Sequence, residues 1–382
     1  MTNDELLSKT ISYLRFPLTV GVVFIHFNLA RGLEIHGVKY GLDNPEWYFF
    51  IANLISEVFS RIGVPLFFII SGFLFFYKKD FENSDIYKQK LKIRTRTLLI
   101  PFVLWNIITI IWAFKCFLPG FSAFYRPAEV QLSFIRIINT FLCNVDNRGI
   151  IIGAPSTGLA EGVYPIDSPL WYVRELMVMA VLSPIIYWLL KKTKQWLVIV
   201  MGFVWFFSSV ILPRENYVYI YTGMLVTALF FFSWGAFYSI FRENIVLSFR
   251  KYRYAPVIYI LIAIADTLTK GLECNEYIDK VGILVGVVAA VVLVSHLLES
   301  NKVKVNTNLA NSSFFIFALH NLFVGSMGNL LFTILHIPGN NPYAMLALYF
   351  AVPTLTILVC LALYMLLKRY APKVCSLLTG GR

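Results

Sequence analysis

Ten mostly apolar stretches, of which the seventh is short and carries Asp266, constrain this chain more than any other feature of its sequence. A transmembrane helix needs about 20 mostly apolar residues. The ten stretches are Ile11–Ala30, Val58–Tyr77, Leu98–Leu118, Pro169–Leu190, Trp196–Leu212, Tyr217–Ile240, Tyr254–Thr269, Val281–Leu298, Ser313–Leu335 and Tyr343–Leu367. Only 14% of the residues are charged, whereas a soluble domain usually carries about 25%. The sequence predicts an all-α integral membrane protein, a bundle of about ten transmembrane helices that forms a single domain over residues 1–382.

The Lys and Arg residues are distributed unevenly between the two sides of this predicted bundle. The side that holds the N-terminus carries 21 of them and the opposite side 9, while Arg15, Arg61 and Arg174 lie within or at the ends of spans. Cytoplasmic loops carry the excess of basic residues. Both termini are therefore predicted to be cytoplasmic, with the lipid bilayer of the plasma (inner) membrane as partner. Because the basic residues form short blocks between apolar runs, the net charge of +12 does not indicate nucleic-acid binding.

The longest connection, residues 119–168, is predicted to be an extracytoplasmic loop. Its segment Val130–Leu142 has the pattern of a short amphipathic helix at the membrane surface, and the rest is rich in Gly, Pro, Asn and Asp. A lid or binding element and a simple linker both fit this composition. No cleavable signal peptide is visible, and the five cysteines lack metal-ligand spacing, so no metal is expected.

Two ionisable residues, Arg15 and His26, lie within the first predicted span. Ionisable groups inside a membrane are costly and usually face a cavity or a partner. The two residues are 11 positions apart, so they differ by only about 20° around a helix and by about 16 Å along it. Arg15 is expected near the cytoplasmic face and His26 in the outer half of the same stripe. The structural alternative is an arginine that reaches the interface and a histidine bonded to a nearby carbonyl.

Two further pairs of residues in the spans point to helix contacts. Arg174 and Glu175 lie just inside the fourth span and could pair with each other. Because neighbouring positions diverge by about 100° on a helix, we expect them instead to bond to other helices. An aromatic belt with an anchoring arginine is the alternative. Ser71 and Gly72, near the end of the second span, would let another helix approach closely.

Two further candidate sites are the arginines before the third span and a histidine within the ninth span. Arg94 and Arg96 precede the third span, where guanidinium groups suit phosphate binding, although the excess of basic residues in cytoplasmic loops alone would explain them. His320 is expected about two turns into the ninth span from the cytoplasmic side, where packing between helices is the alternative role.

Taken in order, these segments resemble the membrane acyltransferase-3 family, bacterial O-acyltransferases that modify surface sugars. The resemblance runs from Tyr13 to about Leu367. Its motifs are Arg15-x10-His26, Phe67-Phe68-Ile69-Ile70-Ser71-Gly72-Phe73-Leu74, Arg94-Thr95-Arg96 before Pro101, Leu170-Trp171-Tyr172 followed by Arg174-Glu175, and Phe315-Ile316-Phe317-Ala318-Leu319-His320. Two features depart from the family: Pro169 stands where a histidine often precedes the tryptophan motif, and no esterase-like domain follows.

The resemblance implies an O-acyltransferase that takes an acyl group from cytosolic acyl-coenzyme A. Acetyl is the expected group, with succinyl or a longer group as alternatives, and the acceptor is a hydroxyl of a cell-surface or lipid-linked glycan. The implied roles are base for His26, donor binding for Arg15, Arg94 and Arg96, and acceptor binding for Trp171, Arg174, Glu175 and His320. A transporter or exporter of a polysaccharide or small solute is the alternative function, although the paired inverted halves or broken helices of many transporters are not evident. A structural scaffold would leave the stripe of Arg15 and His26 unexplained.

Overall fold

The computed structural model describes residues 1–35, 38–78, 81, 84–113, 141–142, 164–212 and 217–381. It divides into two compact units, which are described separately. Unit 1 comprises Met1–Phe81, Tyr187–Ile199 and Phe231–Met365, and unit 2 comprises Glu82–Ile186, Val200–Phe230 and Leu366–Arg382. Each unit is thus assembled from segments that are far apart in the sequence, and the expectation of a single domain stays a prediction.

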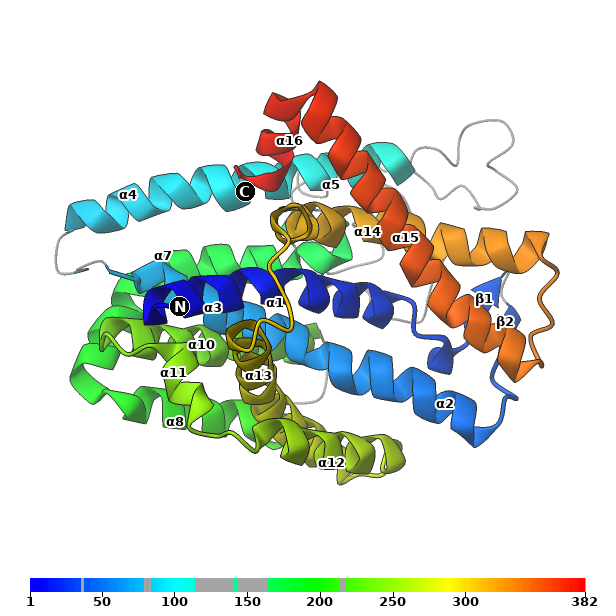
Figure 1. The fold of residues 1–382 in the computed structure, drawn as a ribbon, viewed down its shortest axis with the longest axis horizontal. Helices are drawn as coiled ribbons and strands as arrows, with labels where there is room; N and C mark the ends of the chain where they lie inside the picture. Colours follow the sequence, from blue (N-terminus) through cyan, green and yellow to red (C-terminus); the bar gives the residue numbers. More distant parts are fainter. Residues whose placement is uncertain are drawn as a thin grey trace. The chain divides into compact units, whose positions relative to one another are not determined.

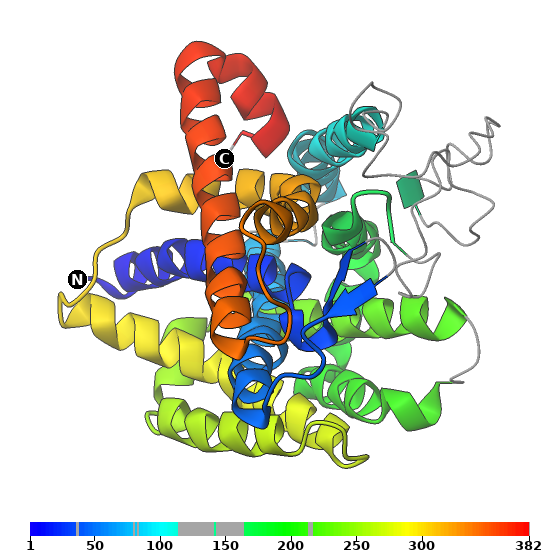
Figure 2. The same ribbon diagram turned by 90° about the vertical axis from the view of Figure 1, so that its right-hand side faces the viewer.

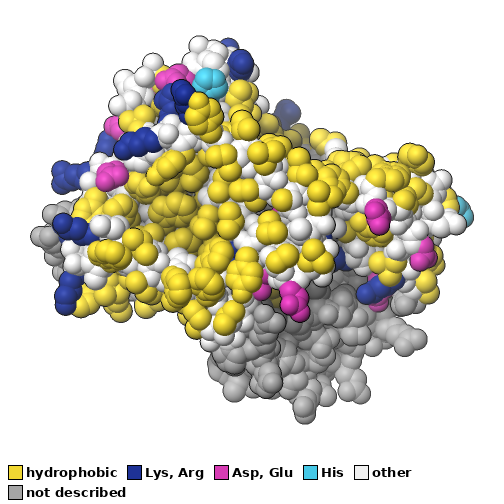
Figure 3. Space-filling model, turned by 90° about the horizontal axis from the view of Figure 1, so that it is seen from below, with side chains coloured by type: hydrophobic (Ala, Val, Ile, Leu, Met, Phe, Trp, Pro, Cys, Tyr) yellow, Lys and Arg dark blue, Asp and Glu magenta, His cyan; other side chains and the backbone are white. Residues whose placement is uncertain are grey.

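Within the described residues, eight helices are long and apolar enough to cross a membrane (Figure 1). They are Asn3–Arg31, Glu46–Phe76, Asp85–Trp112, Ser168–Thr193, Thr222–Ile240, Asn275–Glu299, Thr307–Ile334 and Pro342–Tyr370. On the face shown in Figure 3, hydrophobic side chains cover much of the visible surface. The predicted all-α membrane fold is confirmed.

The other two predicted spans correspond to shorter apolar helices, α8 (Gln195–Phe206) and α12 (Ala255–Leu268). With 12 and 14 residues, they are about 18 and 21 Å long, less than the roughly 30 Å of a hydrocarbon core. The count of ten spans and the cytoplasmic location of the termini stay predictions.

The second span begins at Glu46, well before the predicted start at Val58. It consists of α2 (Glu46–Asn53), the π-helix η2 (Leu54–Phe59), the 3-10 turn η3 (Ser60–Ile62) and α3 (Gly63–Phe76). Charged residues made the early part look like a loop in the sequence. One of them, Glu57, binds Arg61 at 2.7 Å, and a paired charge is compatible with the interior of a span.

Helix α1 (Asn3–His26) lies at the centre of unit 1. It packs against α14 (Thr307–Ile334), α13 (Asn275–Glu299) and α3 (Figures 1 and 2). The Thr2 side chain accepts a hydrogen bond from the Glu5 amide at 3.2 Å, and acidic residues occupy the first turn, so both capping and the helix dipole favour this starting point.

Helices α3 and α10 (Tyr217–Ile240) cross at a pair of glycines. A Cβ atom added to Gly72 would lie 2.0 Å from the Phe232 carbonyl oxygen, and one added to Gly235 would lie 1.9 Å from the Ile69 carbonyl oxygen. Only glycine allows two backbones to approach this closely. The close approach of another helix predicted at Ser71-Gly72 is confirmed at Gly72.

The sequence did not suggest the short hairpin that follows α1. After the 3-10 turn η1 (Leu29–Arg31), β1 (Leu33–Ile35) pairs with β2 (Val38–Tyr40) in antiparallel register (Figure 2).

The remaining described elements are α4 (Ser84–Arg94), the π-helix η4 (Thr95–Leu99), α5 (Ile100–Ala113), η7 (Ser168–Leu170), α7 (Trp171–Thr193), α9 (Ser208–Ile211), α11 (Ile245–Arg250), α15 (Pro342–Tyr370) and α16 (Pro372–Thr379). Of the predicted surface helix Val130–Leu142, all but the last two residues lie outside the described residues.

Candidate active site

His26 is the last residue of α1, and its side chain is exposed on unit 1. Its Nδ1 atom lies 2.9 Å from the Val22 carbonyl oxygen. Because a carbonyl oxygen can only accept a hydrogen bond, Nδ1 carries the ring proton of the neutral imidazole, and Nε2 keeps its lone pair. The carbonyl contact foreseen as a purely structural alternative therefore also directs a basic nitrogen away from the helix backbone.

His320 meets His26 edge to face, with ring centroids 4.9 Å apart. The His320 side chain is fully buried; Nδ1 donates to the Ile316 carbonyl at 3.1 Å, and Nε2 has no hydrogen-bond partner within the described residues. The expectation that His320 lies closer than His26 to the cytoplasmic side is wrong. Helix α14 begins at Thr307 rather than at the predicted Ser313, which puts His320 near its middle and level with His26.

The end of α1 that carries His26 is fixed by the π-helix η2. The Ser56 hydroxyl donates to the Phe24 carbonyl at 2.8 Å, and the Asn28 amide donates to the Glu57 carboxylate at 2.8 Å. A π-helical turn is rare and often marks a functional site. Here its consecutive residues Ser56 and Glu57 hold the chain on either side of His26, so they act as positioning residues.

Glu57 also begins a chain of alternating charges beside this end of α1. Its carboxylate binds Arg31 at 2.6 Å and Arg61 at 2.7 Å; Arg61 reaches Asp279 at 3.5 Å, and Asp279 reaches Lys270 at 3.9 Å. These residues line a cavity of about 430 Å³. Sequence reasoning missed this cavity, although the placement of Arg61 among the residues within spans was a signal for it.

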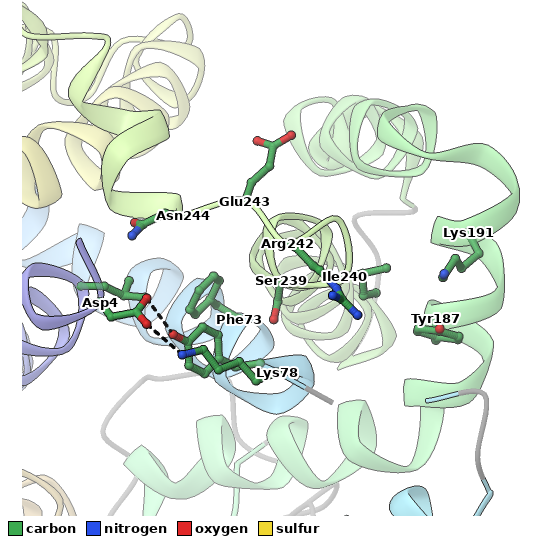
Figure 4. A pocket seen from close by; sticks show the side chains of 12 residues that line it. Asp4, Phe73, Lys78, Tyr187, Lys191, Ser239, Ile240, Arg242, Glu243 and Asn244 are labelled. Carbon is green, nitrogen blue, oxygen red and sulfur yellow. Dashed lines mark hydrogen bonds and ion pairs between the residues drawn. The ribbon is translucent and has the colours of Figure 1, made fainter. Parts of the chain in front are cut away.

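A second cavity, of about 520 Å³, opens where α1 begins (Figure 4). Three basic residues line it: Lys78 after α3, Lys191 in the last turn of α7 and Arg242 after α10. Lys78 binds the Asp4 carboxylate at 2.8 Å, and this hydrogen bond and charge raise the pKa of Lys78. The sequence offered no signal for this cavity beyond the basic blocks themselves.

Helix α1 runs from this cavity, at its first residues, to His26 at its last residue. It is continuous from Asn3 to His26, and Asp4, Arg15 and His26 recur at intervals of 11 residues, so they lie on one stripe. The predicted common stripe of Arg15 and His26 is confirmed. The side chain of Arg15 is half-buried.

The other predicted donor-binding residues belong to unit 2. Arg94 ends α4 and is half-buried, while the next basic residue, Arg96, lies in the π-helix η4 and is exposed. Since Arg15 lies in unit 1, convergence of the three guanidinium groups stays a prediction.

The predicted acceptor-binding residues Trp171, Arg174 and Glu175 open α7, also in unit 2. Arg174 and Glu175 are buried and bind each other at 2.8 Å, and Arg174 also donates to the Leu142 carbonyl at 2.6 Å. Arg174 also donates to the Met224 sulfur of α10 at 3.7 Å, so the expected bond to another helix is present beside the mutual pair. Adjacent side chains long enough to bend toward each other can pair despite the 100° between them, and burial favours pairing.

The fold and the site define a polytopic membrane protein with two histidines in contact on its central helix pair. A family model described as an acyltransferase domain, that of the membrane acyltransferase-3 family, matches residues 9–365. The chain belongs to this family and is thus an acyltransferase and a multi-pass membrane protein. It is 25% identical, over 396 aligned positions covering 99% of this chain and 94% of the relative, to the succinoglycan biosynthesis protein ExoH of Rhizobium meliloti (strain 1021). No solved structure matches the chain.

Proposed function

We propose that this protein transfers an acyl group from acyl-coenzyme A to a hydroxyl group of a cell-envelope glycan in the plasma membrane. The observation that carries the proposal is the orientation of His26, whose Nδ1–H is held by the Val22 carbonyl so that Nε2 is free to act as a base. The family supports acyl transfer rather than transport. The name of the relative, a succinoglycan biosynthesis protein, supports a polysaccharide as acceptor; acetyl is proposed as the acyl group, with succinyl or a longer group as alternatives.

The reaction balances with His26 as the general base. Nε2 takes the proton of the acceptor hydroxyl as its oxygen attacks the thioester carbonyl carbon. The C–S bond then breaks, an ester forms on the sugar, and the proton on His26 passes to the leaving thiolate of coenzyme A. A base in this role contributes typically 10²–10⁴-fold to the rate. The Nε2 atom of His320, buried beside His26, is proposed to bind the substrate at the same level.

The donor is proposed to bind with its phosphates at Arg15 and its thioester at His26. About 13 bonds separate the pyrophosphate phosphorus of coenzyme A from its sulfur, and at roughly 1.25 Å of advance per bond the extended arm spans about 16 Å. Arg15 and His26 are separated by the same axial distance, about 16 Å. Arg94 and Arg96 are proposed as further phosphate partners of the donor.

The acceptor is proposed to approach from the extracytoplasmic side of the membrane. Trp171 would provide a face for its sugar ring to stack on. Arg174 and Glu175, buried and paired, would hold the start of α7 in place behind it. The charged cavity beside the end of α1 offers further groups that donate to and accept from hydroxyls.

His26→Gln tests the proposal, since glutamine keeps hydrogen bonding and approximate size but cannot take up a proton. We expect a folded protein that binds acetyl-coenzyme A as the wild type does, with acyl transfer reduced by about 10²-fold or more. The measurement is transfer of a radiolabelled acetyl group to the envelope glycans of a deletion strain. Substantial transfer by the glutamine variant would assign His26 a positioning role and make His320 the leading candidate for the base.

A further inference from the structure

We propose that the cavity where α1 begins is a binding site for the headgroup of an anionic phospholipid, separate from the site of the acyl donor. Its lining combines Lys78, Lys191 and Arg242 with the rings of Tyr77 and Tyr187. Phosphate is the shared chemistry that such a basic cavity recognises, and two sources present it at a membrane surface: a phospholipid and coenzyme A.

The cavity lies at the level where lipid headgroups are found. Three of the helices that are long enough to span a membrane end beside it, at Phe76, Thr193 and Ile240. Each basic side chain follows or belongs to the last turn of one of these helices (Figure 4). Basic pockets between transmembrane helices at such an interface bind acidic headgroups, and tyrosines are enriched at the same depth.

The charges inside the cavity leave capacity for an anion. Asp4 binds only Lys78 among the three basic residues in the described contacts, and the carboxylate of Glu243 points away from the others in Figure 4. Within the described residues, no hydrogen bond or ion pair engages the Arg242 guanidinium. The Lys191 ammonium lies 5.6 Å from the centre of the Tyr187 ring, which holds it at the cavity wall.

Distance separates this site from the donor site. Asp4 and Leu7, which line the cavity, are 22 and 19 residues before His26, so they lie about 33 and 28 Å from it along α1. The arm of coenzyme A spans only about 16 Å. A donor whose pyrophosphate lay in this cavity would leave its thioester far short of His26, whereas a phospholipid needs no such reach.

The test uses the full-length protein in phosphatidylcholine nanodiscs and measures binding of short-chain phosphatidylglycerol, with short-chain phosphatidylcholine as the neutral comparison. Wild-type protein should bind phosphatidylglycerol in preference. Arg242→Gln and Lys191→Gln should each weaken that binding about tenfold or more, the effect of losing one charge-assisted contact, while leaving the KM for acetyl-coenzyme A unchanged. Two independent variants, each checked for its unfolding temperature, guard against loss of folding in one of them.

Lys194→Gln is the matched control. Lys194 is basic, follows the end of α7 and has a φ of +52°, close to the +54° of Lys78 and the +58° of Arg242, but it does not line the cavity. It should bind phosphatidylglycerol as the wild type does. If Lys194→Gln weakened phosphatidylglycerol binding as much as the cavity variants do, the binding would depend on general surface charge, and the proposal would be overturned. Competition by coenzyme A, with a raised KM for acetyl-coenzyme A in the two cavity variants, would also overturn it and assign the cavity to the donor.

Discussion

At the scale of single residues, the Nε2 atom of His320 is expected to lower the stability of the protein while it contributes to acyl transfer. A buried polar atom without a hydrogen bond costs about 1–3 kcal/mol, and Nε2 is in that position within the described residues. His320→Phe keeps a ring against His26 and removes this atom. We expect the variant to unfold at a higher temperature than the wild type while acyl transfer falls about tenfold or more, because the nitrogen proposed to bind substrate is lost. Unfolding temperature and transfer rate are measured on the same preparation.

The control for this variant is His296→Phe, an exposed histidine in the last turn of α13. It should change neither property. If activity and stability of His320→Phe fell together, His320 would be a packing residue, and unchanged activity would remove it from the substrate site.

At the scale of elements, the crossing of α3 and α10 depends on glycine. An alanine Cβ at Gly235 would lie 1.9 Å from the Ile69 carbonyl oxygen, so the two backbones would have to separate. We expect Gly235→Ala to lower the free energy of unfolding by about 1–3 kcal/mol, the usual cost of overpacking, measured by unfolding in detergent. A larger loss of unfolding free energy would mean that the two helices separate along their length. An unchanged free energy would contradict the close crossing of the two backbones.

Gly325→Ala in α14 is the comparison at this scale, because nothing lies within 4 Å of a Cβ added there. Replacing a helical glycine where space is free stabilises by about 0.4–1 kcal/mol. The two substitutions should therefore have opposite signs.

At the scale of the whole molecule, the prediction concerns orientation in the membrane. The 21-to-9 asymmetry of Lys and Arg between the two sides places both termini in the cytoplasm by the rule that cytoplasmic loops are basic. Reporter fusions after Tyr77 and after Leu118 should report inside and outside, respectively. The reverse result would invert the molecule and move the proposed donor site to the wrong face.

The sequence by itself determined what is local to one helix. Apolar runs of sufficient length identified the eight long helices, since the bilayer sets that length, and the 11-residue spacing put Arg15 and His26 on one stripe, since helix geometry is fixed. Motif order along the chain was enough to identify the family.

Tertiary structure decided what depends on where two helices meet. His26 and His320 are 294 positions apart, and their contact follows from the true start of α14 and its packing on α1. Glu57 is paired with Arg31 and Arg61, so it can lie inside the second span, which begins earlier than the sequence predicted. An isolated charge is costly to bury, whereas a paired charge is tolerated. The basic cavity gathers the ends of three helices, and no periodicity within a single helix records which other helix ends lie beside it.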